Sequence, residues 1–312
     1  MINFRYHVVS LTAVFLALAI GLVVGTAALN GPVADSLKEH VNALQKNNQQ
    51  MRQQVQSMEK ELELEEDFAA QMAELFLPGK LTGKRVVVVT LPTGRDHTEG
   101  VVKMLQLGGA EMTGRIDLQD KFINPDNNND LLELAVTAAR PTSAPTADLP
   151  GNGNGVEKSS ALLATVLLDR APGAAPVSEA DRRAVLAAYT NANYLTTDDP
   201  VTGSAEAVVL VSGQPYVDKD SAKKDESVLN VAVQFDRAGT VVVGGNGSAG
   251  GNVVAAVRSD PVLVQSISTV DNANTVQGQL VTALALVEQV TGKKTGQYGI
   301  ADNATLLPRL PQ

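Results

Sequence analysis

Four residues late in the chain are spaced like a dinucleotide-binding fingerprint. Gly245, Gly247 and Gly250 form a GxGxxG between an expected strand and an expected helix, and Asp271 follows about twenty residues later. In such motifs the glycines allow a pyrophosphate to approach the backbone, and the acid binds a ribose. The motif normally belongs to the first strand–helix unit, whereas this one comes late. We interpret the glycines as a tight turn and Asp271 as the cap of the final helix, with small-ligand binding as the weaker alternative.

A second set of side chains has the chemistry of cation ligands. Asp96, His97 and Glu99 lie in an expected loop after the first strand, where α/β domains place ligands. A loop histidine between acids is more often solvated, so this is a weak metal site. Copper(I) prefers clustered cysteine and methionine, but the chain has no cysteine and its six methionines are dispersed. From these residues we expect no metal and no cofactor.

Composition excludes several other classes of function. Without cysteine there is no disulfide, no thiolate metal site and no cysteine nucleophile. We find no GxSxG and no catalytic constellation, so we predict that the chain is not an enzyme. Its 312 residues carry 34 acids against 25 bases, a net charge of -9, which disfavours nucleic acid as a partner.

Residues 1–30 are predicted to be a membrane anchor with a short leader. Val8–Leu29 contains no charged residue, and at about 1.5 Å per residue it is long enough to cross a hydrocarbon core of about 30 Å. A cleaved signal peptide is the alternative, but its apolar region is shorter. The Lys/Arg balance across the span is nearly even. We place the leader, with Arg5, in the cytoplasm and the rest of the chain outside it, in a single-pass cell-membrane protein.

Small residues recur every four positions within this span, at Ala17, Gly21 and Gly25. Such a stripe lets two helix backbones approach closely in lipid. Small residues are also common in membrane helices, so the stripe by itself is weak support for helix pairing. The heptad pattern of the segment that follows strengthens this interpretation. It predicts a helix-pairing face.

Residues 33–77 are predicted to be a long helix with a coiled-coil seam. Apolar residues alternate at steps of three and four, which is the heptad pattern of helix pairing. The positions that we assign to helix pairing are Leu37, Val41, Leu44, Asn48, Met51, Val55, Met58 and Leu62. Asn48 occupies a core position where a buried amide fixes the register of a parallel dimer. The seam changes phase near residue 64, and Pro78-Gly79 ends the helix.

Residues 84–290 are predicted to form a Rossmann-like, mostly parallel α/β domain. The continuous β-branched run RVVVVTL at Arg85–Leu91 is typical of a strand buried on both faces. Five strands alternate with helices; the strands are expected at 85–91, 111–118, 207–211, 240–243 and 262–266. Helices are expected at 98–107, 130–140, 156–170, 178–189, 226–237, 252–258 and 276–290. We expect a loop insertion at 141–155 and a flexible tail at 291–312.

Three parts of the chain point to a known family: the opening MINFRYHVVSLTAVFLALAIGLVVGTAALNGPV, the predicted coiled coil after it, and the later SISTVDNANTVQGQLVTALAL. Together they resemble the MctB family of actinobacteria. The resemblance covers essentially the whole chain and implies an envelope protein of copper homeostasis, so copper is a possible ligand and the outer membrane a possible location. Corynebacterial relatives called SteB are linked, with a partner called SteA, to the control of cell-wall hydrolases at cell separation.

These features favour a non-enzymatic, dimeric envelope scaffold that controls wall hydrolysis through coiled-coil contacts. The partner of the coil is a second copy, a SteA-like membrane protein or a wall hydrolase. The alternative is a component of copper transport, which needs ligands or a pore; a single membrane helix without clustered ligands offers neither by itself.

Overall fold

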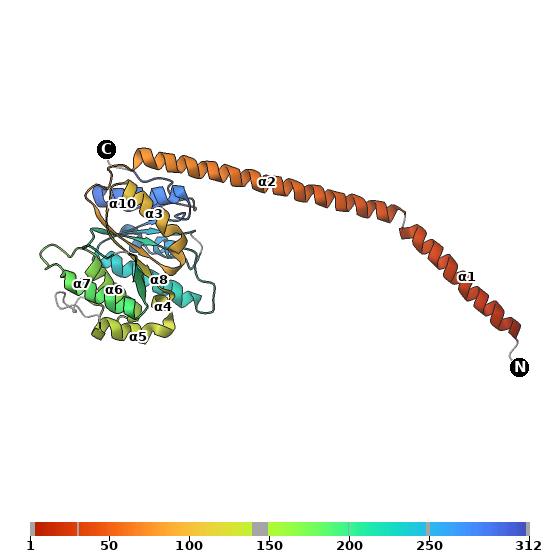
Figure 1. Ribbon diagram of the computed structural model, residues 1–312, viewed down its shortest axis with the longest axis horizontal. Helices are drawn as coiled ribbons and strands as arrows, with labels where there is room; N and C mark the ends of the chain where they lie inside the picture. Colours follow the sequence, from red (N-terminus) through yellow and green to blue (C-terminus); the bar gives the residue numbers. More distant parts are fainter. Residues whose placement is uncertain (1–3, 30, 139–148, 199, 248–249, 310–312) are drawn as a thin grey trace. The chain divides into compact units, whose positions relative to one another are not determined.

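The structure is a computed structural model that describes residues 4–29, 31–138, 149–198, 200–247 and 250–309. It divides into two compact units, Met1–Glu65 and Glu66–Gln312. In its described residues the first unit consists of helices joined by a turn, and the second is an α/β unit (Figure 1).

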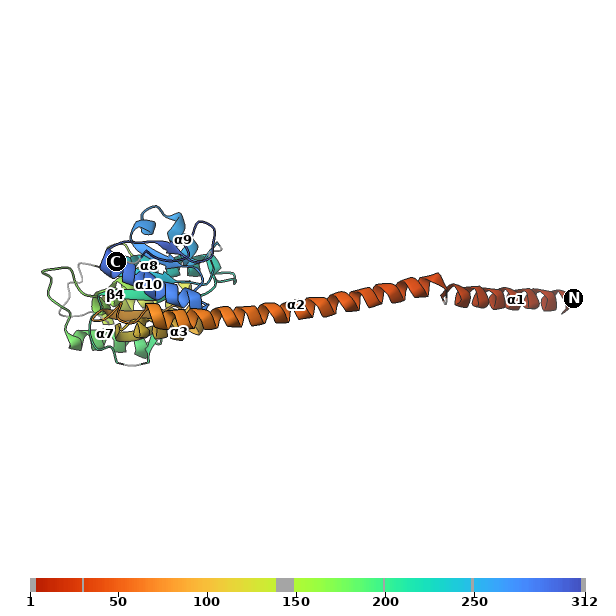
Figure 2. The ribbon, with the colours of Figure 1, turned by 90° about the horizontal axis from the view of Figure 1, so that it is seen from above.

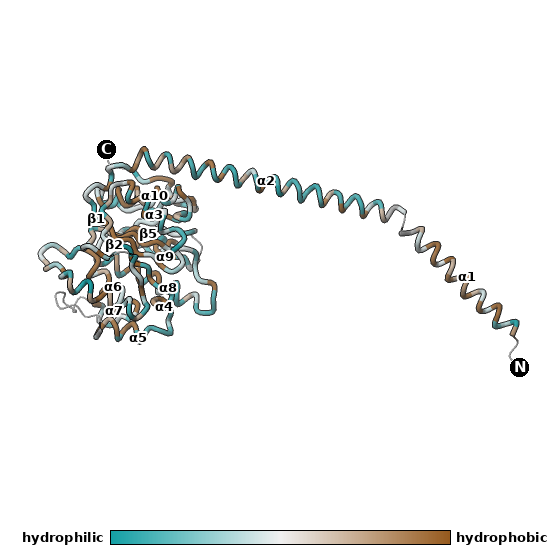
Figure 3. The backbone as a smooth tube through the Cα atoms, in the orientation of Figure 1, coloured by the Kyte–Doolittle hydropathy of each residue, from teal (hydrophilic) through white to brown (hydrophobic). Residues whose placement is uncertain are grey.

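The helical unit consists of α1 (Phe4–Leu29) and most of α2 (Pro32–Phe76). Both predicted helices are confirmed. The two helices differ in hydropathy, as Figure 3 shows. Hydrophobic residues dominate α1, whereas α2 is largely hydrophilic with apolar residues at intervals. The supercoiling of α2 with another helix stays a prediction.

A seven-stranded sheet, mixed and mostly parallel, organises the α/β unit. The strand order is β3-β2-β1-β4-β5-β6-β7, and only the β2–β3 pairing is antiparallel. The strands are β1 (Arg85–Thr90), β2 (Glu111–Leu118), β3 (Leu195–Thr197), β4 (Ala207–Val211), β5 (Thr240–Gly244), β6 (Ile267–Val270) and β7 (Gln297–Tyr298). The chain adds β2 on one side of β1 and later adds β4 on the other. In doubly wound sheets the crevice between two such strands is the usual place for a ligand.

Helices cover both faces of this sheet (Figures 1 and 2). On one face α3 (Arg95–Leu107) and α10 (Val276–Gly292) pack together with buried residues from the end of α2. The other face carries α4 (Asp120–Ile123), α5 (Asn128–Glu133), α6 (Gly155–Leu167), α7 (Glu179–Asn191), α8 (Ser221–Ala238) and α9 (Val253–Ser259). Short 3-10 helices at Pro92–Gly94, Pro125–Asn127 and Leu263–Gln265 and a π-helix at Leu134–Ala138 complete the unit.

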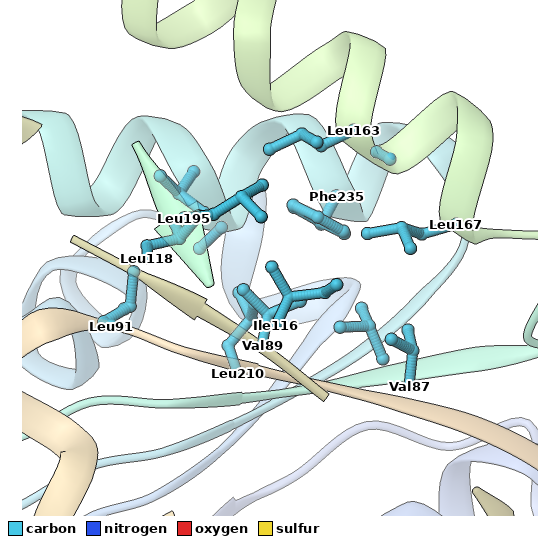
Figure 4. Packing of buried hydrophobic residues seen from close by; sticks show 14 of the residues in the cluster. Val87, Val89, Leu91, Ile116, Leu118, Leu163, Leu167, Leu195, Leu210 and Phe235 are labelled. Atoms are coloured by element: carbon cyan, nitrogen blue, oxygen red, sulfur yellow. The ribbon is translucent and has the colours of Figure 1, made fainter. Parts of the chain in front are cut away.

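The apolar run of β1 is explained by burial on both faces. Val87 and Val89 point into the cluster between the sheet and α6/α8, while Val86 and Val88 join the cluster under α3 and α10. Figure 4 shows the first cluster, in which Phe235 of α8 lies among leucines of α6 and strand residues. Because successive side chains of a strand alternate between faces, a strand covered on both sides must be apolar throughout.

Most elements were predicted correctly, and the errors lie at the sheet edges and near the carboxyl terminus. The strand expected at 262–266 is wrong: Leu263–Gln265 is a 3-10 helix, and β6 begins at Ile267. The expected flexible tail is wrong in part, because Gln297–Tyr298 adds β7 to the sheet. The short edge strand β3 was missed. Much of the expected insertion at 141–155 lies outside the described residues.

Candidate functional site

A stripe of exposed apolar side chains runs along α2. Leu37, Leu44, Met51 and Met58 are each more than 60% exposed, and Val41, Val55 and Leu62 lie between 43% and 53%. Together with exposed Asn48 they form the surface that we call the pairing seam: Leu37, Val41, Leu44, Asn48, Met51, Val55, Met58 and Leu62. Most large apolar residues of the α/β unit are buried, so an exposed apolar run of this length at heptad spacing sets α2 apart from the rest of the chain.

The heptad positions after Leu62 are covered in part by the chain itself. Ala69 is 7% exposed, and Met72 packs against the core cluster under α3 and α10, in which Ala73 and Leu77 are fully buried, whereas Phe76 is 50% exposed. Phe68 and Leu75, which follow the phase change near residue 64, remain outside this contact, since they are 65% and 76% exposed. The seam available to a partner therefore ends at Leu62.

The small residues of α1 are open on their outer side. A Cβ built on Gly21 or Gly25 meets no atom within 4 Å, and Ala17 is exposed. Among the described residues one helix, Phe4–Ala27, is long and apolar enough to cross a membrane. The face that contains Ala17, Gly21 and Gly25 is thus free to pack against a second helix in lipid.

The crevice between β1 and β4 is filled by the chain. The amide of Gly213 donates to Oγ1 of Thr93 over 3.0 Å, and a Cβ on Gly213 would lie 1.8 Å from the carbonyl oxygen of Thr93. A Cβ on Gly94 would lie 2.3 Å from the carbonyl oxygen of Val211. Glycine at both positions lets the two loops touch backbone to backbone. The loops after β1 and β4 therefore contact each other at the position where such sheets usually bind a ligand.

The glycine loop after β5 is bonded to the loop after β6. The amide of Gly245 donates to Val270, the amide of Gly247 donates to the carbonyl oxygen of Asp271 over 2.5 Å, and Gly247 adopts a left-handed φ of 83°. Gly250 is exposed. In a phosphate-binding loop these amides would point at the anion, whereas here two of them are already used within the chain.

Asp271 does not cap the final helix, which corrects our expectation. Thr275 is the N-cap of α10 and accepts the amide of Gly278. Asp271 is 2% exposed and pairs with Arg258 over 2.7 Å, and its carboxylate also accepts the amides of Ile300 and Ala301. Gly245 and Gly247 are therefore neighbours of Asp271, as the fingerprint predicts, but the carboxylate of Asp271 pairs with Arg258. No local pattern predicts this pairing, since Arg258 lies on α9 and Asp271 lies in the loop after β6.

Asp96, His97 and Glu99 lie in the first two turns of α3 and not in a loop, because the helix begins at Arg95. Glu99 pairs with Arg115 over 3.4 Å. Burial lowers the pKa of His97, with Asp96 opposing the shift. No three His, Asp or Glu side chains within the described ranges are grouped so as to hold a metal ion.

A pocket of about 330 Å³ opens between the carboxyl ends of α6 and α8. Its polar lining includes Asp169, Gln234 and Arg237. Asp169 is held by Arg85 at 2.6 Å and by the hydroxyl of Ser204 at 2.5 Å. Burial opposes ionisation of Asp169, but these hydrogen bonds outweigh it and lower its pKa. Its carboxylate is thus committed to the chain.

Comparison with known proteins identifies the family. The family described as "Copper transport outer membrane protein, MctB" matches residues 1–308. This chain belongs to the MctB family. The proteins named Copper transporter MctB from Mycobacterium tuberculosis (strain ATCC 25618 / H37Rv) and from Mycobacterium bovis are each 30% identical to it over 313 residues, covering 97% of this chain and 98% of the relative. The protein of that name from Mycobacterium leprae is 28% identical over 314 residues, with 98% of each chain covered.

The likeness to these MctB proteins extends through the anchor, α2 and the α/β unit, because the matches are nearly full length. The resemblance inferred from the three parts of the chain is confirmed. The names state copper transport for the relatives and an outer-membrane location for the family.

Proposed function

We propose that this MctB-family chain is a membrane-anchored envelope protein that acts as a non-enzymatic interaction scaffold. Its working surface is the pairing seam, and the process that it serves is the control of cell-wall hydrolysis at cell separation. The anchor is α1, with the amino terminus in the cytoplasm and the α/β unit outside.

The exposed seam is the observation that carries this proposal. Full burial of one large aliphatic side chain is worth about 1.5–3 kcal/mol, and seven such side chains lie uncovered on one face of α2. A helix that stays exposed to solvent gains no burial free energy from apolar side chains at heptad spacing. A helix that packs against another helix gains burial free energy at every heptad. The α/β unit is compatible with the same role. The loops after β1 and β4 contact each other where a ligand would usually bind, and the amides of Gly245 and Gly247 are hydrogen-bonded to Val270 and Asp271.

The names of the relatives favour copper transport as the second candidate function. Transport requires ligands or a path through the membrane. The sequence has no cysteine, and the described residues contain one helix suited to the membrane, so a path would have to be built from several copies. A third, weaker candidate is small-ligand binding at the Gly245–Gly250 loop.

Deletion of the gene separates the two leading functions. The scaffold predicts chained, unseparated cells with ordinary copper tolerance, whereas transport predicts copper-sensitive cells with ordinary septation. Complementation with Leu44→Asp tests the seam itself, since a carboxylate in the middle of the stripe prevents helix packing. Gln53→Asp is the matched control, because it adds the same charge at an exposed outer position of the same helix.

In the scaffold function Leu44→Asp leaves the cells chained and Gln53→Asp restores separation. Equal restoration by both variants would contradict a role for the seam. A phosphatase fused to the carboxyl terminus tests the orientation and is expected to be active outside the cytoplasm.

A further inference from the structure

We infer that the pairing seam binds the same segment of a second copy of this chain in the antiparallel direction, with Leu37 of one copy beside Leu62 of the other. The inference rests on the proposed function, in which α2 acts by pairing with a helix. It adds the identity of the partner, the direction of pairing and the register.

The length of the free seam limits the overlap. Ala69 and Met72, which continue the heptad, pack on the α/β core of their own chain, so a partner can use the positions from Leu37 to Leu62. At 1.5 Å per residue these two ends are roughly 38 Å apart. An antiparallel pair in which Leu37 meets Leu62 uses every free position and requires none of the covered ones.

The residues that flank the seam determine which direction is favoured. Eight flanking positions border its core, and side chains at these positions set the orientation of coiled coils. They are Lys38, His40, Gln45, Asn47, Arg52, Gln54, Glu59 and Glu61, all exposed. Lys38 and His40 lie at the amino end, Arg52 lies near the middle, and the two acids, Glu59 and Glu61, lie at the carboxyl end.

Parallel pairing forms no ion pair between these flanking residues. In parallel dimers each flanking residue meets the one five positions later on the other helix. His40 then meets Gln45, Asn47 meets Arg52, Gln54 meets Glu59, and Glu61 meets Glu66. No pair joins Lys or Arg to an acid, and the last pair opposes two carboxylates at each side of the dimer.

Antiparallel pairing brings the basic residues of one end against the acids of the other. With Leu37 beside Leu62, Lys38 meets Glu59 of the second copy and His40 meets Glu61, while Gln45 meets Arg52 and Asn47 meets Gln54. Twofold symmetry makes each of these pairs occur twice. Charged residues that flank the pairing seam therefore meet residues of opposite charge on the second copy only when that copy runs in the reverse direction.

The register follows from the same residues. A shift of one heptad in one direction brings Lys38 against Arg52, and a shift in the other brings Arg52 against itself and Glu65 onto Val41. In the proposed register Asn48 lies beside Met51 of the second copy, in the two layers that flank the symmetry axis. The two Asn48 amides are then only three residues apart along the axis, within reach of each other.

Antiparallel pairing of α2 also determines the positions of the two α1 helices. The two α1 helices leave from opposite ends of the paired segment. Both enter one membrane when the paired α2 segments lie along its surface; α1 and α2 are separate helices, since α1 ends at Leu29 and α2 begins at Pro32.

Cysteine cross-linking of the full chain in liposomes tests the direction, and the natural chain has no cysteine to interfere. We expect a short bismaleimide to link Leu37→Cys to Leu62→Cys when the two single variants are mixed, and to link neither variant with itself. Self-linking of Leu37→Cys would establish parallel pairing and overturn the inference. A chain that stays monomeric and unlinked in every combination would overturn it as well.

Charge exchange tests the register independently. Lys38→Glu is expected to raise the dissociation constant of the dimer by roughly 5- to 30-fold, and Glu59→Lys in the same chain is expected to restore it. Lys46→Glu, on the outer face, is the control and should leave it unchanged. Failure of the second change to rescue the first would contradict the proposed contact between these residues.

The outcomes also separate this inference from the function on which it rests. If Leu44→Asp abolishes cell separation while the cross-links are absent or parallel, the seam works through another arrangement and only the antiparallel pairing is wrong. If Leu44→Asp restores separation and no cross-link forms, both proposals are wrong.

Discussion

Large apolar residues are mostly buried in the α/β unit of this protein and mostly exposed in its helical unit. In the α/β unit the residues of β1 and β4 are buried on both faces of the sheet, and the loops at the strand ends are bonded to one another. Along the first 31 residues of α2, up to Leu62, the large apolar side chains whose accessibility is described are at least 43% exposed. The α/β unit buries most of its large apolar side chains within itself, whereas those of the pairing seam are exposed.

The contrast separates stability from function. Changes in the α/β unit should alter unfolding, and changes in the seam should alter association. Four substitutions test this division, from the largest expected effect on stability to the smallest.

Asp271→Ala should destabilise the α/β unit by about 3–5 kcal/mol, because it leaves the charge of Arg258 buried without its carboxylate. Urea unfolding of the full chain in detergent, followed by circular dichroism, measures the change. Asp302→Ala, at an exposed position, is the control. A loss below 1 kcal/mol would mean that the ion pair does not hold the strand ends together.

Gly213→Ala should cost about 1–3 kcal/mol, because the added methyl group cannot fit 1.8 Å from the carbonyl oxygen of Thr93 without parting the two loops. The same unfolding experiment applies. At Gly203 a Cβ meets no atom within 4 Å, so Gly203→Ala should be close to neutral. Equal effects of the two substitutions would show that the β1/β4 crevice is open.

Asp169→Asn should cost under about 1 kcal/mol at neutral pH, since the pair with Arg85 is partly exposed. The pKa of Asp169 is lowered in the folded chain from an ordinary value of 3.8. Its contribution is therefore present above that ordinary value and is lost as the pH falls through the lowered one.

Unfolding at several pH values measures this effect. The free-energy difference between the natural chain and Asp169→Asn should shrink below about pH 4, while exposed Asp126→Asn should show no such difference. A gap that widens on acidification would contradict the lowered pKa.

Leu44→Asp should leave the unfolding free energy of the α/β unit unchanged within about 0.5 kcal/mol, because Leu44 is 68% exposed and belongs to the other unit. Its effect should appear instead in sedimentation, as loss of the associated species. Destabilisation of the α/β unit by this substitution would break the division between the two regions.

The elements that follow from local pattern were predicted well. The apolar run of α1, the heptads of α2 and the β-branched run of β1 each have a period that one kind of element satisfies. Ser178 was expected to begin a helix, and it caps α7 by accepting the amide of Asp181. The shortest strands, β3 and β7, were missed because three and two residues are too few to show a period.

The candidate sites show the limit of spacing as a guide. Gly245, Gly247 and Asp271 do lie together, as a fingerprint predicts, but their hydrogen bonds go to neighbouring loops and to Arg258. Asp96, His97 and Glu99 lie in the first two turns of α3, where Glu99 pairs with Arg115 of β2. Which polar group meets which depends on contacts between distant segments.

The amino-acid sequence alone determined the apolar helix α1, the heptad pattern of α2 and the alternation of strands and helices, because each depends on residues a few positions apart. Only the tertiary structure decided that the loops after β1 and β4 touch, that Asp271 is paired, and that Ala69 and Met72 are covered. Those outcomes depend on groups that are 13 to 120 residues apart in the chain, such as Arg258 with Asp271 and Gly213 with Thr93, which no local period records.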